Sequence, residues 1–210
     1  PECEEAIRTG LDELEIDINN TDLYLTHLHS DHVGLAATIM PKDATIYMGR
    51  VDYEYLMTSV TGSHWDDTDK VFLSHGFPED KIIELHTKNP ARAFQVAGPF
   101  EAVKLEDGDK ITVGDYEFKC IYVPGHTPGN TCLYYEKDAL MFLGDHVLFD
   151  ITPNITSWYG VRDSLSNYIE SLKKIREYKM VTALPAHRNT KGINVYDRID
   201  QLLEHHKARL

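Results

Sequence analysis

The chain has 210 residues, 42% of them hydrophobic, which is enough to form the core of one folded domain. Its formal net charge is −13, which argues against a nucleic-acid partner, because such partners usually face a basic surface. No stretch is long and apolar enough to span a membrane and no signal peptide is visible, so we expect a cytoplasmic protein with a small-molecule substrate. These features are compatible with a homodimer as well as with a monomer.

The first predicted element is an amphipathic helix from Glu4 to Leu14, with Ile7, Leu11 and Leu14 on one face. A short apolar run, Leu23–Leu25, follows it and predicts a strand.

A histidine-rich segment, HxHxDH at residues 27–32, comes directly after this strand. Alternation along an extended chain places His27 and His29 on the same side, and a tight turn then brings Asp31 and His32 round to face them. Neutral imidazoles and carboxylates are the ligands of zinc and similar metals. A solvated loop would explain a single His-x-His pair, but four candidate ligands on this spacing predict a metal site.

The next part of the chain predicts helices around one strand. We expect a short helix at Gly34–Ile39, a strand at Thr45–Met48 and a helix at Val51–Met57. Residues 58–99 are less regular and rich in aromatic residues, with one helix at Pro78–Leu85 that has proline in its first turn. This segment is either a lid over the site or a peripheral insertion that packs only on itself.

Strands and helices continue to the end of the chain. The expected strands are Ala102–Leu105, Lys110–Val113, Tyr116–Val123, Thr131–Tyr135, Ala139–Leu143 and Met180–Leu184, and the expected helices are Ser164–Glu177 and Val195–Ala208. Mixed strands with flanking helices and no repeats indicate one α/β domain over residues 1–210.

Three further candidate ligands each follow one of these strands. His126 lies in GHTPGN (residues 125–130), Asp145 in LGDH (residues 143–146) and His187 in LPAH (residues 184–187). A lone histidine after Pro-Gly is more often a turn residue. The shared position at strand ends, where loops converge into active sites, favours all three as ligands.

Other chemistries have little support in the sequence. The three cysteines, Cys3, Cys120 and Cys132, have no CxxC spacing, and the last two lie in apolar runs, so we expect buried reduced thiols there. A Gly-x-Ser-x-Gly elbow is absent from the sequence, so a serine nucleophile is unsupported.

The ordered motifs HxHxDH, GHTPGN, GD and PAH resemble those of the metallo-β-lactamase-fold hydrolase superfamily, and within it the glyoxalase II-like thioesterases and lactonases. The resemblance covers residues 22–187 and implies an αββα four-layer sandwich. It implies that strands precede the first helix; none is visible here, so we expect a truncated chain. It also implies two metal ions, the first bound by His27, His29 and His126, the second by Asp31, His32 and His187, with Asp145 bridging them.

These features predict a dinuclear metal-dependent hydrolase in which a hydroxide between the metals attacks the carbonyl of a small thioester, lactone or ester. We expect two zinc ions per chain, with manganese or iron as alternatives. Asp31 is the expected catalytic residue, because it would orient the hydroxide and relay a proton. Trp158 and Tyr159, in the loop after Asp145, are candidate substrate contacts, although packing would explain both equally well.

Two other classes stay open. One is an oxidoreductase similar to persulfide dioxygenases, which would hold a single iron and consume oxygen. The other is a non-catalytic metal-binding module. Structural zinc sites are normally closed and four-coordinate, whereas this ligand set leaves room for water and substrate, which argues against the second class.

Overall fold

The computed structural model describes residues 2–88 and 94–210. The contacts between residues form two compact units. Unit 1 contains the described residues up to Met48 and from Tyr53 to Lys104, and unit 2 contains Gly49–Asp52 and Leu105–Leu210. The expected single domain stays a prediction, and the two units are described separately.

Unit 1 begins with the expected amphipathic helix, α1 (Glu2–Glu13), although none of its residues is buried. A short 3-10 helix (Ile18–Asn20) leads into a three-stranded sheet in the order β1, β2, β3. These strands are Leu23–Leu25, Ile46–Gly49 and Val103–Leu105. Strands β1 and β2 run parallel, with Leu25 opposite Met48, and both of these side chains belong to the core of the unit.

The short helix expected at Gly34–Ile39 is confirmed as α3, which begins two residues later, but a second short helix before it was not predicted. The two single-turn helices are α2 (Ser30–Val33) and α3 (Ala36–Ile39). Gly34 lies between them because a Cβ there would sit 2.5 Å from the carbonyl oxygen of Ser30, so the first turn can close only over a glycine. The helix expected after β2 is confirmed as α4 (Arg50–Val60).

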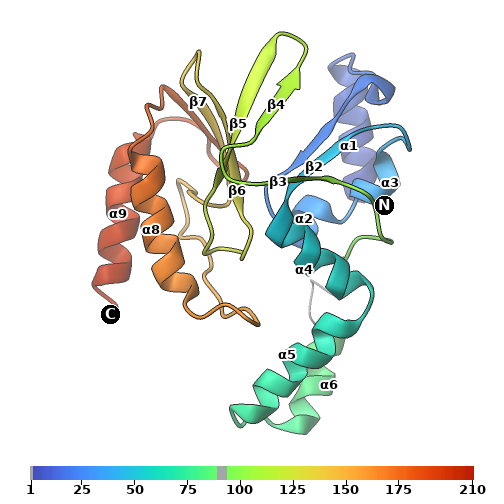
Figure 1. Ribbon diagram of the computed structural model, residues 1–210, viewed down its shortest axis with the longest axis vertical. Helices are drawn as coiled ribbons and strands as arrows, with labels where there is room; N and C mark the ends of the chain where they lie inside the picture. The colour runs from blue at the N-terminus through green and yellow to red at the C-terminus, as the bar shows by residue number, and fades with distance from the viewer. Residues whose placement is uncertain (1, 89–93) are drawn as a thin grey trace. The chain divides into compact units, whose positions relative to one another are not determined.

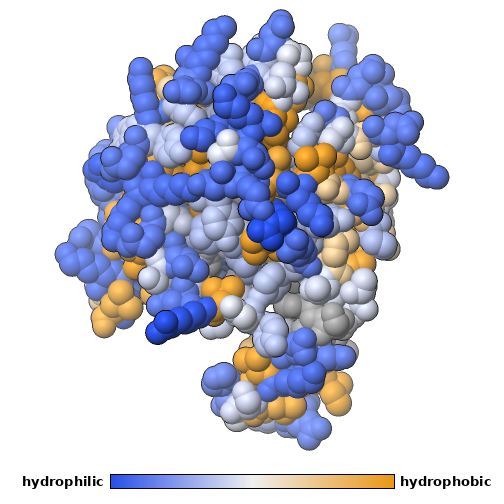
Figure 2. All heavy atoms as spheres, viewed as in Figure 1, coloured by the Kyte–Doolittle hydropathy of each residue, from blue (hydrophilic) through white to orange (hydrophobic). Residues whose placement is uncertain are grey.

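Residues 58–99 are more helical than expected. The helix predicted at Pro78–Leu85 is confirmed as α6 (Glu79–Lys88), but α5 (Ser63–Ser74) was not predicted. Large apolar side chains on these two helices and on the turn between them are exposed, and hydrophobic residues gather over the same segment in Figure 2. The residues are Phe72, Leu73, Phe77 and Ile83. Its function as a lid stays a prediction, and residues 89–93 lie outside the described part of the chain.

Unit 2 is built on a five-stranded sheet in the order β4, β5, β6, β7, β8. The first four strands are antiparallel neighbours, whereas β7 and β8 run parallel, as a connection through a helix requires. The strand bounds are Lys110–Val113, Tyr116–Tyr122, Thr131–Tyr135, Leu140–Gly144 and Thr182–Pro185, all within two residues of the predicted bounds.

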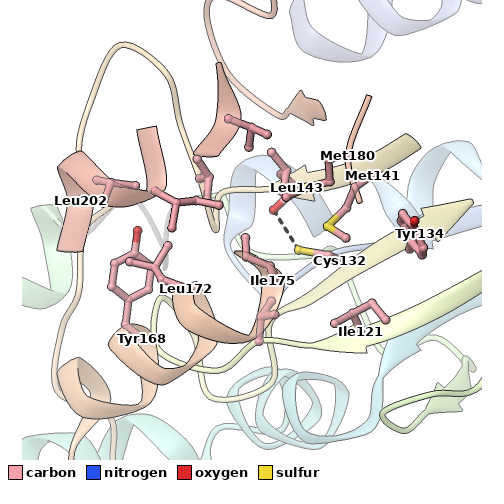
Figure 3. Close-up of a cluster of buried hydrophobic side chains, with 14 of the residues drawn as sticks. Ile121, Cys132, Tyr134, Met141, Leu143, Tyr168, Leu172, Ile175, Met180 and Leu202 are labelled. Atoms are coloured by element: carbon pink, nitrogen blue, oxygen red, sulfur yellow. Dashed lines mark hydrogen bonds between the residues drawn. The ribbon is translucent and has the colours of Figure 1, made fainter. Parts of the chain in front are cut away.

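Helices α8 (Ser164–Arg176) and α9 (Val195–Lys207) lie side by side next to this sheet (Figure 1). Figure 3 shows the core between these helices and the sheet, where Tyr168, Leu172 and Ile175 of α8 face the side chains of the strands. Cys132 lies in this core and its thiol donates a hydrogen bond to the carbonyl oxygen of Leu143 at 3.6 Å. Cys120 is also buried and forms no disulfide with another described residue, as predicted.

The structure is therefore a mixed α/β fold with two sheets and flanking helices, which is the predicted class. Among the described residues, no helix combines the length and hydropathy needed to cross a membrane.

Candidate functional site

The histidine-rich segment of unit 1 brings its four predicted ligands together. His27 follows β1, is fully buried, and its Nε2 lies 3.1 Å from Nδ1 of His29. Helix α2 then turns the chain, so that the ring centroid of His32 lies 4.0 Å from that of His27. Asp31 Oδ2 lies 3.6 Å from His32 Nε2. The extended pair followed by a turn is the arrangement that the sequence predicted.

These side chains differ in their exposure to solvent. The Asp31 side chain is 59% exposed, whereas that of His32 is 14% exposed and His27 is buried. The Thr26 hydroxyl is hydrogen-bonded to Nδ1 of His27 at 3.0 Å, which leaves Nε2 directed at the other histidines. The cluster therefore combines one buried and two half-buried imidazoles with one carboxylate that solvent can reach.

In unit 2, the loop after β5 places His126. Gly125 has φ +140°, and a Cβ at this position would lie 2.4 Å from Cβ of Tyr168, so only glycine fits. The loop is closed at its base by a hydrogen bond of 2.8 Å from the N–H of Val123 to the carbonyl oxygen of Asn130. His126 is consequently held close against α8.

The orientation of the His126 ring is fixed by its second nitrogen. Nδ1 lies 2.7 Å from the carbonyl oxygen of Asn154, which can only accept, so Nδ1 carries the proton and donates it. Nε2 is then left unprotonated, with a lone pair that can bind a metal. A backbone carbonyl that fixes the tautomer in this way is typical of metal-binding histidines.

Asp145 lies between two histidines of unit 2. The residue directly follows β7 and is buried. Its carboxylate Oδ2 lies 3.6 Å from His126 Nε2, and its Oδ1 lies 3.4 Å from His187 Nε2. Two ligands of a tetrahedral ion, each about 2.1 Å from it, are about 3.4 Å apart. The donor set of unit 2 therefore has the chemistry and the spacing of a metal site, with one carboxylate oxygen directed at each histidine.

A residue that the sequence did not single out supports the His126 loop. Asp52, in the first turn of α4, is fully buried and accepts hydrogen bonds from the Thr127 hydroxyl and from the Gly129 N–H, each at 2.5 Å. A Cβ on Gly129 would lie 2.2 Å from the backbone nitrogen of Asp52, so glycine allows this close approach. Asp52 thus fixes the residues directly after His126.

The remaining residues of interest lie around this cluster. His146 is buried against the Tyr168 ring, with centroids 5.3 Å apart, and burial lowers its pKa to about 3, so its ring is neutral at physiological pH. Trp158 Nε1 donates a hydrogen bond to the carbonyl oxygen of His126 at 3.3 Å, and Tyr159 is 53% exposed. Neither lines the cavity beside Asp145, so their role as substrate contacts stays a prediction.

Similarity to known proteins agrees with the motifs. Over 143 residues the chain is 28% identical to a hydroxyacylglutathione hydrolase of Maricaulis maris (strain MCS10), with 63% of this chain and 54% of that protein aligned. It is 30% identical over 106 residues to the acyl-coenzyme A thioesterase MBLAC2 of Bos taurus, with 49% of this chain and 37% of that protein aligned. The chain therefore spans about half, or less, of the length of these curated relatives.

The fold is also shared with solved structures. A metallo-β-lactamase family protein of Thermus thermophilus superposes with a TM-score of 0.82 and 24% sequence identity, over 98% of this chain and 67% of that one. The family model described as the metallo-β-lactamase superfamily matches residues 21–187, which include every predicted metal ligand. The chain belongs to the metallo-β-lactamase superfamily.

Proposed function

We propose that the chain is a dinuclear metal-dependent hydrolase that acts on a small thioester, lactone or ester. The observation that carries this proposal is the position of Asp145, whose two carboxylate oxygens lie 3.6 and 3.4 Å from His126 Nε2 and His187 Nε2. A carboxylate that offers one oxygen to each of two histidines can bridge two ions. The relatives named as a hydroxyacylglutathione hydrolase and an acyl-coenzyme A thioesterase support a thioester substrate.

The residues of both clusters would hold the metals, which would supply Lewis acidity and an activated water near neutral pH. The family ligand pattern assigns His27, His29 and His126 to one ion, and Asp31, His32 and His187 to the other. Imidazole nitrogens and carboxylate oxygens suit zinc, manganese or iron.

The protein side of the reaction follows from the described side chains. Asp31 is exposed enough to exchange protons with solvent and would orient the attacking water and accept its proton. Asn154, through its carbonyl oxygen, keeps the His126 ring in the tautomer that can bind a cation. Leu148 and Ile151 line the cavity beside Asp145 and would keep the acyl group in an apolar environment.

The test compares Asp145→Ala with Asp138→Ala. Asp138 is an exposed acid in the turn before β7, so the control removes the same charge at the other end of the same strand. We expect about two metal ions per wild-type chain by mass spectrometry and turnover of at least one substrate in a panel of thioesters, lactones and a β-lactam. Asp145→Ala should lose metal and hydrolysis, and Asp138→Ala should keep both.

The opposite results are equally informative. Full metal content and full hydrolysis in Asp145→Ala would contradict the dinuclear proposal. One iron per chain with oxygen consumption and no hydrolysis would identify an oxidoreductase. Tightly bound metal with neither activity would identify a structural metal-binding module.

A further inference from the structure

A cavity of about 450 Å³ lies within unit 2, beside the Asp145 cluster. Three of its lining residues are the candidate ligands His126, Asp145 and His187. Much of the rest of its wall is apolar and comes from the loop after β7, with Leu148, Ile151 and Pro153; Arg188 is the cationic residue of the lining. A compound that enters this space would therefore meet metal ligands, an apolar wall and a guanidinium group.

The apolar wall is held in place by the backbone of its own loop. Arg198 of α9 donates hydrogen bonds from Nε to the carbonyl oxygen of Leu148 and from Nη2 to that of Ile151, both at 2.8 Å. The His126 ring holds the carbonyl oxygen of Asn154 at the far end of the same loop. A wall fixed by three such contacts needs little reordering when a ligand binds.

Arg188 has an unfavourable backbone conformation at the edge of this cavity. Its φ is +65°, a left-handed value that is uncommon for residues with a side chain, and it directly follows His187. The next residue is fixed, because the Asn189 N–H donates a hydrogen bond to Asp150 Oδ2 at 3.1 Å. Strained residues of this kind concentrate at ligand-binding sites, where the surrounding structure enforces them.

The guanidinium of Arg188 forms no ion pair with any residue in the described ranges 2–88 and 94–210. Some other cations of unit 2 are paired: Arg176 with Asp200, and Lys174 with Asp107. In a chain with net charge −13, a cavity cation that no carboxylate neutralises is suited to an anionic ligand. Asp145 is the acid that lines the same cavity, and bound metal would offset its charge.

We infer that Arg188 binds a carboxylate of the substrate, so that the enzyme prefers acyl compounds that carry a second, anionic group. This inference rests on the proposed hydrolase function. The planar guanidinium can donate two parallel hydrogen bonds to a carboxylate, and a flexible ammonium could not reproduce that geometry. The apolar wall beside it fits the methylene groups between the carboxylate and the scissile carbonyl.

The test is a matched pair of substrates and a matched pair of variants. The substrates are succinyl and butyryl thioesters of N-acetylcysteamine, which have the same acyl length and differ in the terminal carboxylate. The variants are Arg188→Met and Lys191→Met; Lys191 is exposed in the same loop and does not line the cavity. Arg188→Met should raise KM for the succinyl compound by about tenfold or more and leave the butyryl compound within about twofold. Lys191→Met should change neither.

A second substrate pair locates the carboxylate. Acetyl thioesters of 3-mercaptopropionate and of propanethiol place the charge on the leaving group, and an Arg188-dependent preference there, without one for succinyl, would assign the anion to that side. Equal KM values for charged and neutral members of both pairs in the wild type would overturn the inference.

A binding measurement separates this inference from the proposed function. Succinate and butyrate are titrated into the purified protein and its variants by calorimetry, which needs no turnover. Arg188-dependent binding of succinate without hydrolysis of any substrate would keep the carboxylate site and reject the hydrolase. Hydrolysis of butyryl thioester with no succinate binding and no preference for a charged substrate would keep the hydrolase and reject the carboxylate site.

Discussion

Replacement of Asp52 tests how far a buried carboxylate supports the candidate ligand His126. In Asp52→Ala, the Thr127 hydroxyl and the Gly129 N–H lose an acceptor inside the protein, where neither is exposed to water. Each buried donor left without its partner costs about 1–3 kcal/mol, so the free energy of unfolding should fall by about 2–6 kcal/mol, and we expect about 4. That is a large part of the 5–15 kcal/mol typical of a folded protein.

Asp52→Asn separates the loss of a hydrogen bond from the loss of volume. The amide keeps one oxygen acceptor in nearly the same place, so one of the two donors stays satisfied and the other faces an N–H group. We therefore expect a loss of about 2 kcal/mol for this variant. Both losses should be accompanied by weaker metal binding, because Thr127 directly follows His126.

The assay is urea unfolding followed by circular dichroism at 222 nm, with linear extrapolation to water. Glu54→Ala is the control, since it removes an exposed acid from the same helix and should change stability by less than about 0.5 kcal/mol. If Asp52→Ala is as stable as the control, the two hydrogen bonds carry little energy and the reasoning is wrong.

Three further predictions concern packing, titration and the accessibility of the thiols. Gly125→Ala should lower the free energy of unfolding by about 2–4 kcal/mol, because the new Cβ would overlap Tyr168 and φ is +140°; wild-type stability in urea would contradict this. The pKa of His206 is lowered by burial and by the neighbouring His205 and Arg209. Its contribution to stability is therefore present above pH 6.5, the pKa of the free side chain, and is lost as the pH falls. Proton NMR should find that His206 titrates below pH 6.5, and a midpoint at the value of the free side chain would refute the prediction. A thiol reagent should label Cys3 alone in the native protein, because burial raises the pKa of the Cys132 thiol and hides it, and labelling of all three thiols before unfolding would show an open core.

The parts of the fold that the sequence predicted well are those set by local patterns. Strands β4 and β6 have the predicted bounds, Lys110–Val113 and Thr131–Tyr135, because each is limited by turn residues. The histidine-rich segment was recognisable for the same reason, since its four candidate ligands lie within six residues. Local spacing alone was enough to bring them together.

The elements that were missed depend on surroundings that local patterns do not contain. Helix α5 has exposed apolar residues on its surface, so its apolar positions do not form the single buried stripe that marks a surface helix. It begins after Gly62 and ends before Gly76, both at positive φ, and these two glycines were the available signal. The split between α2 and α3 at Gly34 depends on a close approach to Ser30, which only the folded chain reveals.

Asp52 shows the same limit at the candidate site, where it matters most. An acid in the first turn of a helix is usually explained by the helix dipole, and a glycine in Pro-Gly-Asn by a turn, so neither residue draws attention in the sequence. In the folded chain Asp52 and Gly129 contact each other although they are 77 positions apart in the sequence. Because Gly129 has no Cβ, the Asp52 carboxylate can approach closely enough to accept a hydrogen bond from the Gly129 N–H. A metal ligand can be found from its own motif because the metal dictates its chemistry. The residue that holds the ligand loop in place is free to come from anywhere in the chain, provided that it is buried and satisfies the loop's donors, and only its burial and its partners identify it.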